Sequence, residues 1–194
     1  MIAVLLLATV LAQAGTPPPQ APTTQNRAPV QAQPAPAHEP AVPGVDRLFA
    51  TAAFHGTNAE IDMARLALRR GTANEVKQFA GKMIAEHTAM MEEMMPALRR
   101  VMPAMPPQRL AAPDALAMRH LEGASPADFD QGYILQQIGG HLATLAAFQA
   151  EADNGTDAQL KSLARKWLPS IQAHLELAVD ITKHIGGSSP FKSH

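Results

Sequence analysis

Cysteine is absent from the 194-residue sequence. Its absence excludes disulfides, thiolate metal sites and a lipoprotein anchor, which needs a cysteine just after the signal peptide. Aromatic residues are also scarce, with one Trp, one Tyr and six Phe, whereas β-sheets are rich in aromatic and β-branched side chains. Alanine, leucine and methionine, which favour helix, dominate instead. The composition therefore predicts an all-α protein.

No charge of one sign predominates, because 16 Lys and Arg residues stand against 17 Asp and Glu residues. A chain with almost no net charge creates no overall electrostatic potential that would attract nucleic acid or an anionic membrane. The sequence also lacks a nucleophile–base pair, a phosphate-binding loop and a basic–aromatic patch. It therefore indicates no catalytic residue, and we predict no nucleic-acid partner.

Only one long apolar run occurs, over residues 2–11. It is too short to span a bilayer, which takes about 20 residues, but it has the length of a signal-peptide core. The Ala-Gln-Ala sequence at 12–14 forms a small-residue cleavage site after it. We therefore expect a signal peptide over 1–14 and export to the periplasm or cell envelope, without a transmembrane segment in the mature protein.

Proline is concentrated in residues 15–44, which hold nine of the 17 prolines. Proline offers no backbone donor, and the segment has almost no large apolar side chain to offset the entropy lost on ordering. We therefore predict a disordered linker over 15–44, a folded domain over 45–186 and a polar tail over 187–194.

Four amphipathic stretches account for the folded domain. Apolar residues recur at steps of three and four over 46–70, 73–101, 126–153 and 157–185, which is the spacing of one helix face. A short additional helix is expected at 112–121. The domain is therefore predicted to be helical throughout.

Residues suited to helix capping stand at the start of these stretches. They are Asp46, Thr72 with Glu75, Ser125, and Thr156 with Gln159. The short links before the second and fourth long helices turn each helix back on its predecessor. Two such hairpins predict an antiparallel four-helix bundle. The longer middle connection either crosses over along the bundle, as in ferritin-like proteins, or is an elaborated local loop.

Each long helix carries an ionisable residue on its apolar face. His87 lies four residues from both Met83 and Met91. Glu60, His141 and His174 likewise lie at helical spacing from the apolar residues of their own helices. With a rise of about 1.5 Å per residue, their offsets from the two tight turns place all four within about 12 Å along the bundle axis.

Two interpretations of this set stay open. An unpaired buried imidazole costs roughly 1–3 kcal/mol, so the first interpretation is that the four groups satisfy one another in a structural hydrogen-bond network. Alternatively, Glu60, His87, His141 and His174 share a Zn, Fe, Mn or Cu ion through neutral imidazoles and a carboxylate oxygen. No Glu-x-x-His sequence occurs, which argues against a di-iron carboxylate centre.

A second metal candidate follows one flank of the 73–101 helix. It consists of His87, Met90, Met91, Met94 and Met95, at helical spacing. Thioethers suit Cu(I), whereas methionines at such spacing also serve as flexible core filler.

Four stretches resemble the exported bacterial proteins of the domain of unknown function 4142 family. They are AEIDMARLAL, EVKQFAGKMIAEH, FDQGYILQQIGGH and LPSIQAHLELA, between about residues 46 and 185. The order Glu60, His87, His141, Pro169, His174 follows that family's pattern, whereas the methionine-rich segment and the proline-rich leader depart from it. The resemblance implies a ferritin-like bundle behind a signal peptide, often described as an outer-membrane protein. It implies no activity and no catalytic residues.

Two functional hypotheses follow, and either is compatible with a homo-oligomer. The first is a non-catalytic envelope interaction or stress-related domain, with structural histidines and partner proteins that the sequence does not specify. The second is a metal-binding protein with a Glu/His site in the bundle core. The first hypothesis would be favoured if each histidine ring made its own hydrogen bond to backbone or side chains at a different level of the bundle.

Overall fold

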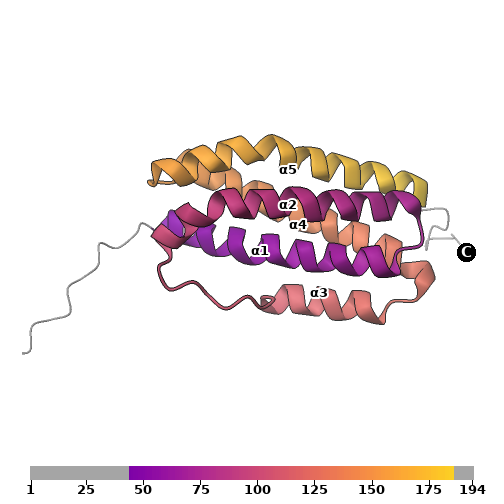
Figure 1. Ribbon diagram of the computed structural model, residues 1–194. Coiled ribbons are helices and arrows are strands. Elements are labelled where there is room, and N and C mark those ends of the chain that lie inside the picture. The colour runs from indigo at the N-terminus through magenta and orange to yellow at the C-terminus, as the bar shows by residue number, and fades with distance from the viewer. Residues whose placement is uncertain (1–43, 186–194) are drawn as a thin grey trace, which may run out of the picture. The chain divides into compact units, whose positions relative to one another are not determined.

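The computed structural model describes residues 44–185, which are helical apart from short connections and contain no strand (Figure 1). Its five helices are α1 (Gly44–Arg70), α2 (Asn74–Val101), α3 (Ala112–Gly123), α4 (Pro126–Asn154) and α5 (Ala158–Ile185). The predicted all-α class is thereby confirmed. The predicted signal peptide, the linker except Gly44, and the tail lie outside the described residues.

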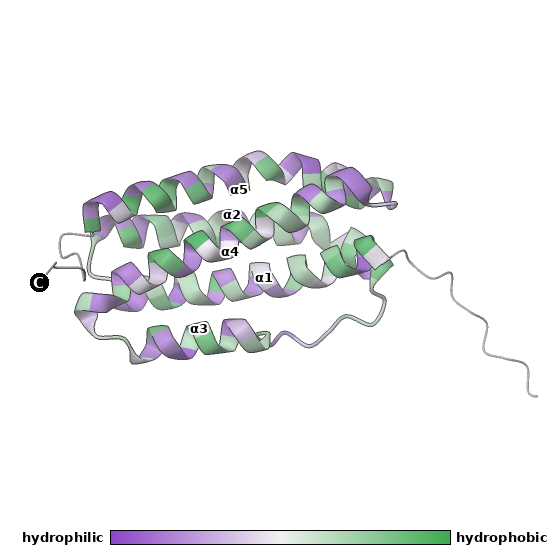
Figure 2. Cartoon of the chain, turned by 180° about the vertical axis from the view of Figure 1, so that it is seen from behind, coloured by the Kyte–Doolittle hydropathy of each residue, from purple (hydrophilic) through white to green (hydrophobic). Residues whose placement is uncertain are grey.

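The four long helices lie side by side, with α1 against α2 and α4, and α5 against α4 and α2. The short helix α3 lies along the outside, against α1 and α4 (Figure 2). Within residues 44–185, no helix combines the length and the hydrophobicity needed for a membrane span.

The connection between the two hairpins crosses the bundle lengthwise. At one end, the hydroxyl of Thr51 near the start of α1 lies 3.4 Å from the sulfur of Met102, just after α2. At the other end, Arg70 donates to the carbonyl oxygens of Leu121 at 2.8 Å and Ala124 at 2.6 Å. The chain between α2 and α4 therefore runs from one end of α1 to the other, and α3 is the helical part of this connection.

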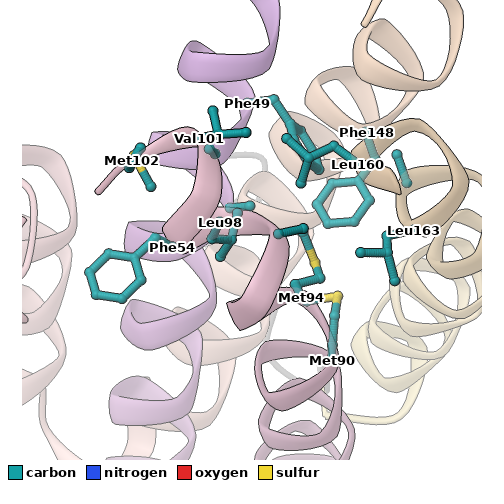
Figure 3. Packing of buried hydrophobic residues seen from close by; sticks show 14 of the residues in the cluster. Phe49, Phe54, Met90, Met94, Leu98, Val101, Met102, Phe148, Leu160 and Leu163 are labelled. Atoms are coloured by element: carbon teal, nitrogen blue, oxygen red, sulfur yellow. The ribbon is translucent and has the colours of Figure 1, made fainter. Parts of the chain in front are cut away.

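The hydrophobic core consists of two clusters, one toward each end of the bundle. The first contains Phe49, Leu98 and Phe148, which lie toward the α4–α5 turn (Figure 3). The second contains Phe79 and Tyr133, toward the α1–α2 turn. Members of both clusters come from all four long helices, because each helix turns its apolar stripe inward.

Asp46 does not cap α1 as predicted, because α1 begins two residues earlier, at Gly44. Its carboxylate instead reaches the α4–α5 turn, where it accepts hydrogen bonds from Thr156 N at 2.8 Å, Asp157 N at 3.1 Å and the Thr156 hydroxyl. The predicted Thr156 capping box is therefore wrong. Asp157 caps α5 instead, by accepting from Leu160 N at 2.9 Å.

Asp130, just after the first turn of α4, binds the α1–α2 turn in the same way. It accepts from Thr72 N at 3.0 Å, Ala73 N at 2.8 Å and the Thr72 hydroxyl. Thr72 is therefore not available for the predicted capping box with Glu75, and the N-cap residue of α2 is Ala73, without a side-chain bond. The tight turn of each hairpin is thus tied to the other hairpin by one buried carboxylate.

Gly71 is required at the end of α1 by close approach of the backbone. A Cβ at this position would lie 2.7 Å from the Ala67 carbonyl oxygen and 3.2 Å from Asp130 Oδ1. We expect Gly71→Ala to lower the free energy of unfolding by about 1–3 kcal/mol, because the turn must shift to admit the methyl group.

Gly81, inside α2, is the matched control, because a Cβ there meets nothing within 4 Å. Gly81→Ala should raise the free energy of unfolding by roughly 0.5–1 kcal/mol, the helix-propensity difference between the two residues. Urea unfolding of both variants measures the two effects. Changes of the same sign would contradict the assigned role of Gly71.

Candidate metal centre

One polar side chain from each long helix meets the others between the two hydrophobic clusters. Glu60 comes from α1, His87 from α2, His141 from α4 and His174 from α5, with exposed fractions of 6%, 1%, 0% and 2%. The same amphipathic stripes that build the core carry these residues inward. The structure therefore brings all four sequence-predicted site residues together in one layer.

The three imidazole rings form a nearly equilateral triangle. Their centroids are 5.6 Å apart for His87 and His141, and 5.4 Å apart for the two pairs that include His174. One nitrogen from each ring lies within 4.8 Å of the other two. The rings thus converge on one point at one level of the bundle.

Two of the rings are fixed by hydrogen bonds outside the triangle. His141 Nδ1 donates to the Gln137 carbonyl oxygen, one helical turn earlier, at 2.8 Å. His174 Nε2 bonds to Glu86 Oε2 at 2.6 Å, and Glu86 is also paired with Lys82. These bonds leave Nε2 of His141 and Nδ1 of His174, neither of which has a hydrogen-bond partner among residues 44–185.

Burial keeps the imidazoles neutral. Desolvation, followed by the neighbouring rings, lowers the pKa of His87 to about 3. Desolvation also lowers the pKa of His141 to about 4, against the opposing effect of its bond to the Gln137 carbonyl. The pKa of His174 is lowered by burial, although Glu86 partly offsets the shift. Only neutral imidazole can bind a metal ion, so the rings are in the ligating form at neutral pH.

Glu60 lies beside the triangle. Its Oε2 is 3.0 Å from His87 Nδ1, and its Oε1 is 3.6 Å from His141 Nδ1. Burial, with a further contribution from the Asp114 charge, raises the pKa of Glu60 to about 8. Without a cation, a neutral carboxyl group therefore faces a neutral His87 ring. A divalent ion nearby would reverse this preference by stabilising the carboxylate.

The donor set fits a transition-metal ion. Nitrogens bound tetrahedrally to one Zn²⁺ at about 2.0–2.1 Å lie roughly 3.4 Å apart, so small ring movements from the 4.8 Å limit would suffice. Metal-binding histidines usually have their second nitrogen held by a carboxylate or a backbone carbonyl, as His141 and His174 do. Within residues 44–185, no other group of three His, Asp or Glu residues converges in this way.

The methionine flank has a packing role in the structure. Met90 and Met94 are buried among Leu98 and Leu163 in the first hydrophobic cluster (Figure 3). Met91 and Met95 pack against this cluster as partly buried residues. Their placement favours the core-filler interpretation over the Cu(I) site.

Glu86 is the residue of this centre that the sequence reasoning missed. It adjoins His87, but its partner is His174, 88 positions away on α5. Helical spacing relates Glu86 only to Lys82, four residues earlier, and gives no signal for a partner on another helix. Gln137 was also missed as a bonding partner, although its place four residues before His141 is a local signal for the carbonyl contact.

Comparison with known proteins gives one match. The family described as "Domain of unknown function (DUF4142)" matches residues 31–181, a range that contains all four residues of the polar layer. No curated protein and no solved structure matches the chain.

Proposed function

Because the chain belongs to the DUF4142 family, whose description assigns no activity, we propose its function from the site itself: it binds one transition-metal ion at His87, His141 and His174. The Gln137 carbonyl and Glu86 orient two of these rings, and Glu60 is close enough to His87 to join them as a ligand. Neutral imidazoles suit Zn, Cu and Fe, and a Glu60 carboxylate among the ligands would extend the set to Mn.

The convergence of buried ring nitrogens without partners carries this proposal. Nε2 of His87, Nε2 of His141 and Nδ1 of His174 have no hydrogen-bond partner in the described part of the chain. Leaving each of them unsatisfied costs about 1–3 kcal/mol. A single cation would satisfy all three at once, and the hydrophobic clusters on either side would shield it from water.

A second candidate is the non-catalytic envelope interaction or stress-related domain, in which the histidines are purely structural. The observation that favours it is that His141 and His174 each already make one hydrogen bond. In this case the polar layer would serve only to fix the register of the helices.

Zinc uptake by the metal-free mature protein distinguishes the two candidates. We expect titration calorimetry near pH 7.5 to give one equivalent of Zn²⁺, and thermal unfolding to shift upward. Zinc at about 1,000 times its dissociation constant adds roughly 4 kcal/mol to the stability of the state that binds it. His87→Ala and His141→Ala should lose both responses, since each removes one of three ligands.

His120→Ala is the matched control, because His120 is exposed and lies outside the cluster. It should bind zinc as the wild type does. Circular dichroism of every variant shows whether the helices persist. A folded wild type that takes up no Zn, Mn, Fe or Cu near neutral pH would overturn the metal proposal and leave the structural candidate.

The setting proposed for this function is a ferritin-like four-helix bundle exported to the periplasm or cell envelope. The lengthwise connection between the hairpins supports the ferritin-like arrangement. The apolar run over 2–11 and the cleavage sequence at 12–14 support export. Mass spectrometry of the exported protein should find the mature N-terminus at Gly15, and an uncleaved chain retained in the cytoplasm would contradict export.

A further inference from the structure

A groove of about 1060 Å³ lies between α1 and α4, beside the first half of α3. Figure 2 shows these three helices on the near side of the bundle. None of the three rings of the histidine centre lines this groove, and Glu60 is the residue that the two share. Pockets for small molecules usually measure about 300–1,000 Å³, so this groove has room for a ligand of substantial size.

Small side chains leave the groove unfilled. Gly56 on α1 and Gly140, Ala143 and Ala147 on α4 line it, and a Cβ added at Gly56 would meet nothing within 4 Å. The second half of α3 is held to the bundle by the buried Leu121, which is the one buried residue of that helix. The first half of α3 therefore stands beside the groove without filling it.

Three buried polar side chains line this groove: Thr57, Glu60 and Gln137. Glu60 is 6% exposed and Gln137 is 1% exposed. Gln137 Oε1 has no hydrogen-bond partner among residues 44–185, and neither has Glu60 Oε2, although His87 Nδ1 lies 3.0 Å from it. A Cβ at Gly140 would lie 3.1 Å from Glu60 Oε1, so the glycine leaves room for the carboxyl group beside α4. Unsatisfied buried acceptors cost about 1–3 kcal/mol each, and a bound hydrogen-bond donor would remove that cost.

We propose that this groove binds a small amphipathic molecule, whose apolar body lies along α1 and α4 and whose hydroxyl or amino head group donates hydrogen bonds to Glu60 and Gln137. The lining is largely made of alanine, glycine and other apolar side chains, which suit an apolar body. The unpaired lining groups are oxygen acceptors, and Asp114 adds an acidic group. The remaining ionisable residues of the lining are Arg47, which is exposed and solvated, and His55.

Three dodecyl compounds test this assignment on the full mature protein: 1-dodecanol below its solubility limit, and dodecylamine and dodecanoate below their micelle concentrations. We expect titration calorimetry to show one-to-one binding of the alcohol and the amine. Dodecanoate should bind at least tenfold more weakly, because its carboxylate cannot donate to the unpaired Gln137 oxygen and its charge would be buried in a largely apolar groove that also holds Asp114. Absence of binding by the alcohol and the amine would overturn the proposal, as would dodecanoate binding as tightly as they do.

Gly56→Leu fills the groove and should weaken binding of the alcohol and the amine at least tenfold. Gly139→Leu is the control, because Gly139 is exposed on α4, lies outside the groove and has nothing within 4 Å of an added Cβ. It should bind as the wild type does, and equal loss in both variants would overturn the assignment.

A wild-type dimer that Gly56→Leu converts to monomer would identify a second copy as the occupant and would also overturn it. Zinc uptake should be unchanged in Gly56→Leu, so failure here is distinguishable from failure of the metal proposal.

Discussion

Asp130→Ala is expected to lower the free energy of unfolding by about 3–5 kcal/mol. Asp130 is 6% exposed and accepts hydrogen bonds from two backbone N–H groups and one hydroxyl at the α1–α2 turn. Hydrogen bonds to a charged group contribute about 1.5–3 kcal/mol each, and all three donors lose their partner when the carboxylate is removed. Urea denaturation near pH 7 measures the loss.

Asp62→Ala is the matched control for this prediction. Asp62 is paired with Arg65 at 2.9 Å, but about half of its side chain is exposed, at 48%. Exposed pairs of this kind contribute about 0–1 kcal/mol, so the control should change stability by no more than that. A loss below about 1 kcal/mol in Asp130→Ala would mean that water replaces the carboxylate at the turn.

Glu151→Gln is expected to make the protein more stable at pH 8 by about 1–3 kcal/mol, while leaving its stability at pH 5 nearly unchanged. Glu151 is fully buried, and its two oxygens have no donor among the described residues. Burial, followed by the charge and hydrogen bonding of Asp46 and the charge of Asp157, raises the pKa of Glu151 to about 7, with Lys161 opposing the shift. Below about pH 7 the Glu151 carboxyl group is therefore protonated in the fold, where it lies beside the Asp46 carboxylate.

The sign of the pH effect follows from the raised pKa. The folded protein holds the Glu151 proton more tightly than the unfolded chain, whose pKa has the ordinary value of 4.5. The resulting stability is complete below about pH 4.5 and is lost as the pH rises through about 7. Glutamine keeps a donor toward Asp46 at every pH, so this loss should disappear in the variant.

Urea unfolding from pH 5 to pH 8 of the wild type and Glu151→Gln tests the effect. The pKa of Glu60 is also raised, to about 8, but this residue is the same in both proteins, so their difference isolates Glu151. Glu122→Gln, at an exposed position, should follow the wild type at every pH. Parallel curves for the wild type and Glu151→Gln would show that the two carboxyl groups do not share a proton.

The sequence by itself determined the helical class and the residues of the polar layer. Both depend on short-range information: a helix repeats every 3.6 residues, so a histidine four residues from Met83 and from Met91 must face the core with them. Ser125 is a further local case, since its predicted N-cap role is confirmed by the hydrogen bond that it accepts from Asp128 N. Export stays a prediction from the N-terminal sequence alone.

Tertiary structure decided which atoms of these residues meet. Asp46 and Thr156 are 110 positions apart, and Glu86 and His174 are 88 apart. Such contacts depend on the rotation and axial register of each helix, which are set by packing across the whole bundle rather than by any local pattern. For this reason Asp46 was expected to act within its own helix, and the role of Asp130 was not predicted. The contact of Glu86 with His174 and that of Asp46 with Glu151 could not be predicted from residue spacing either.

The path of the middle connection also required the tertiary structure. Both connection types were compatible with the helix pattern, because the sequence does not specify at which end of the bundle the second hairpin begins. The contacts of Arg70 with Leu121 and Ala124 place that start beside the end of α1. The same path places α3 beside α1 and α4 and forms the groove. No local pattern predicts a cavity, because its volume is what remains after side chains from three separate helices have packed.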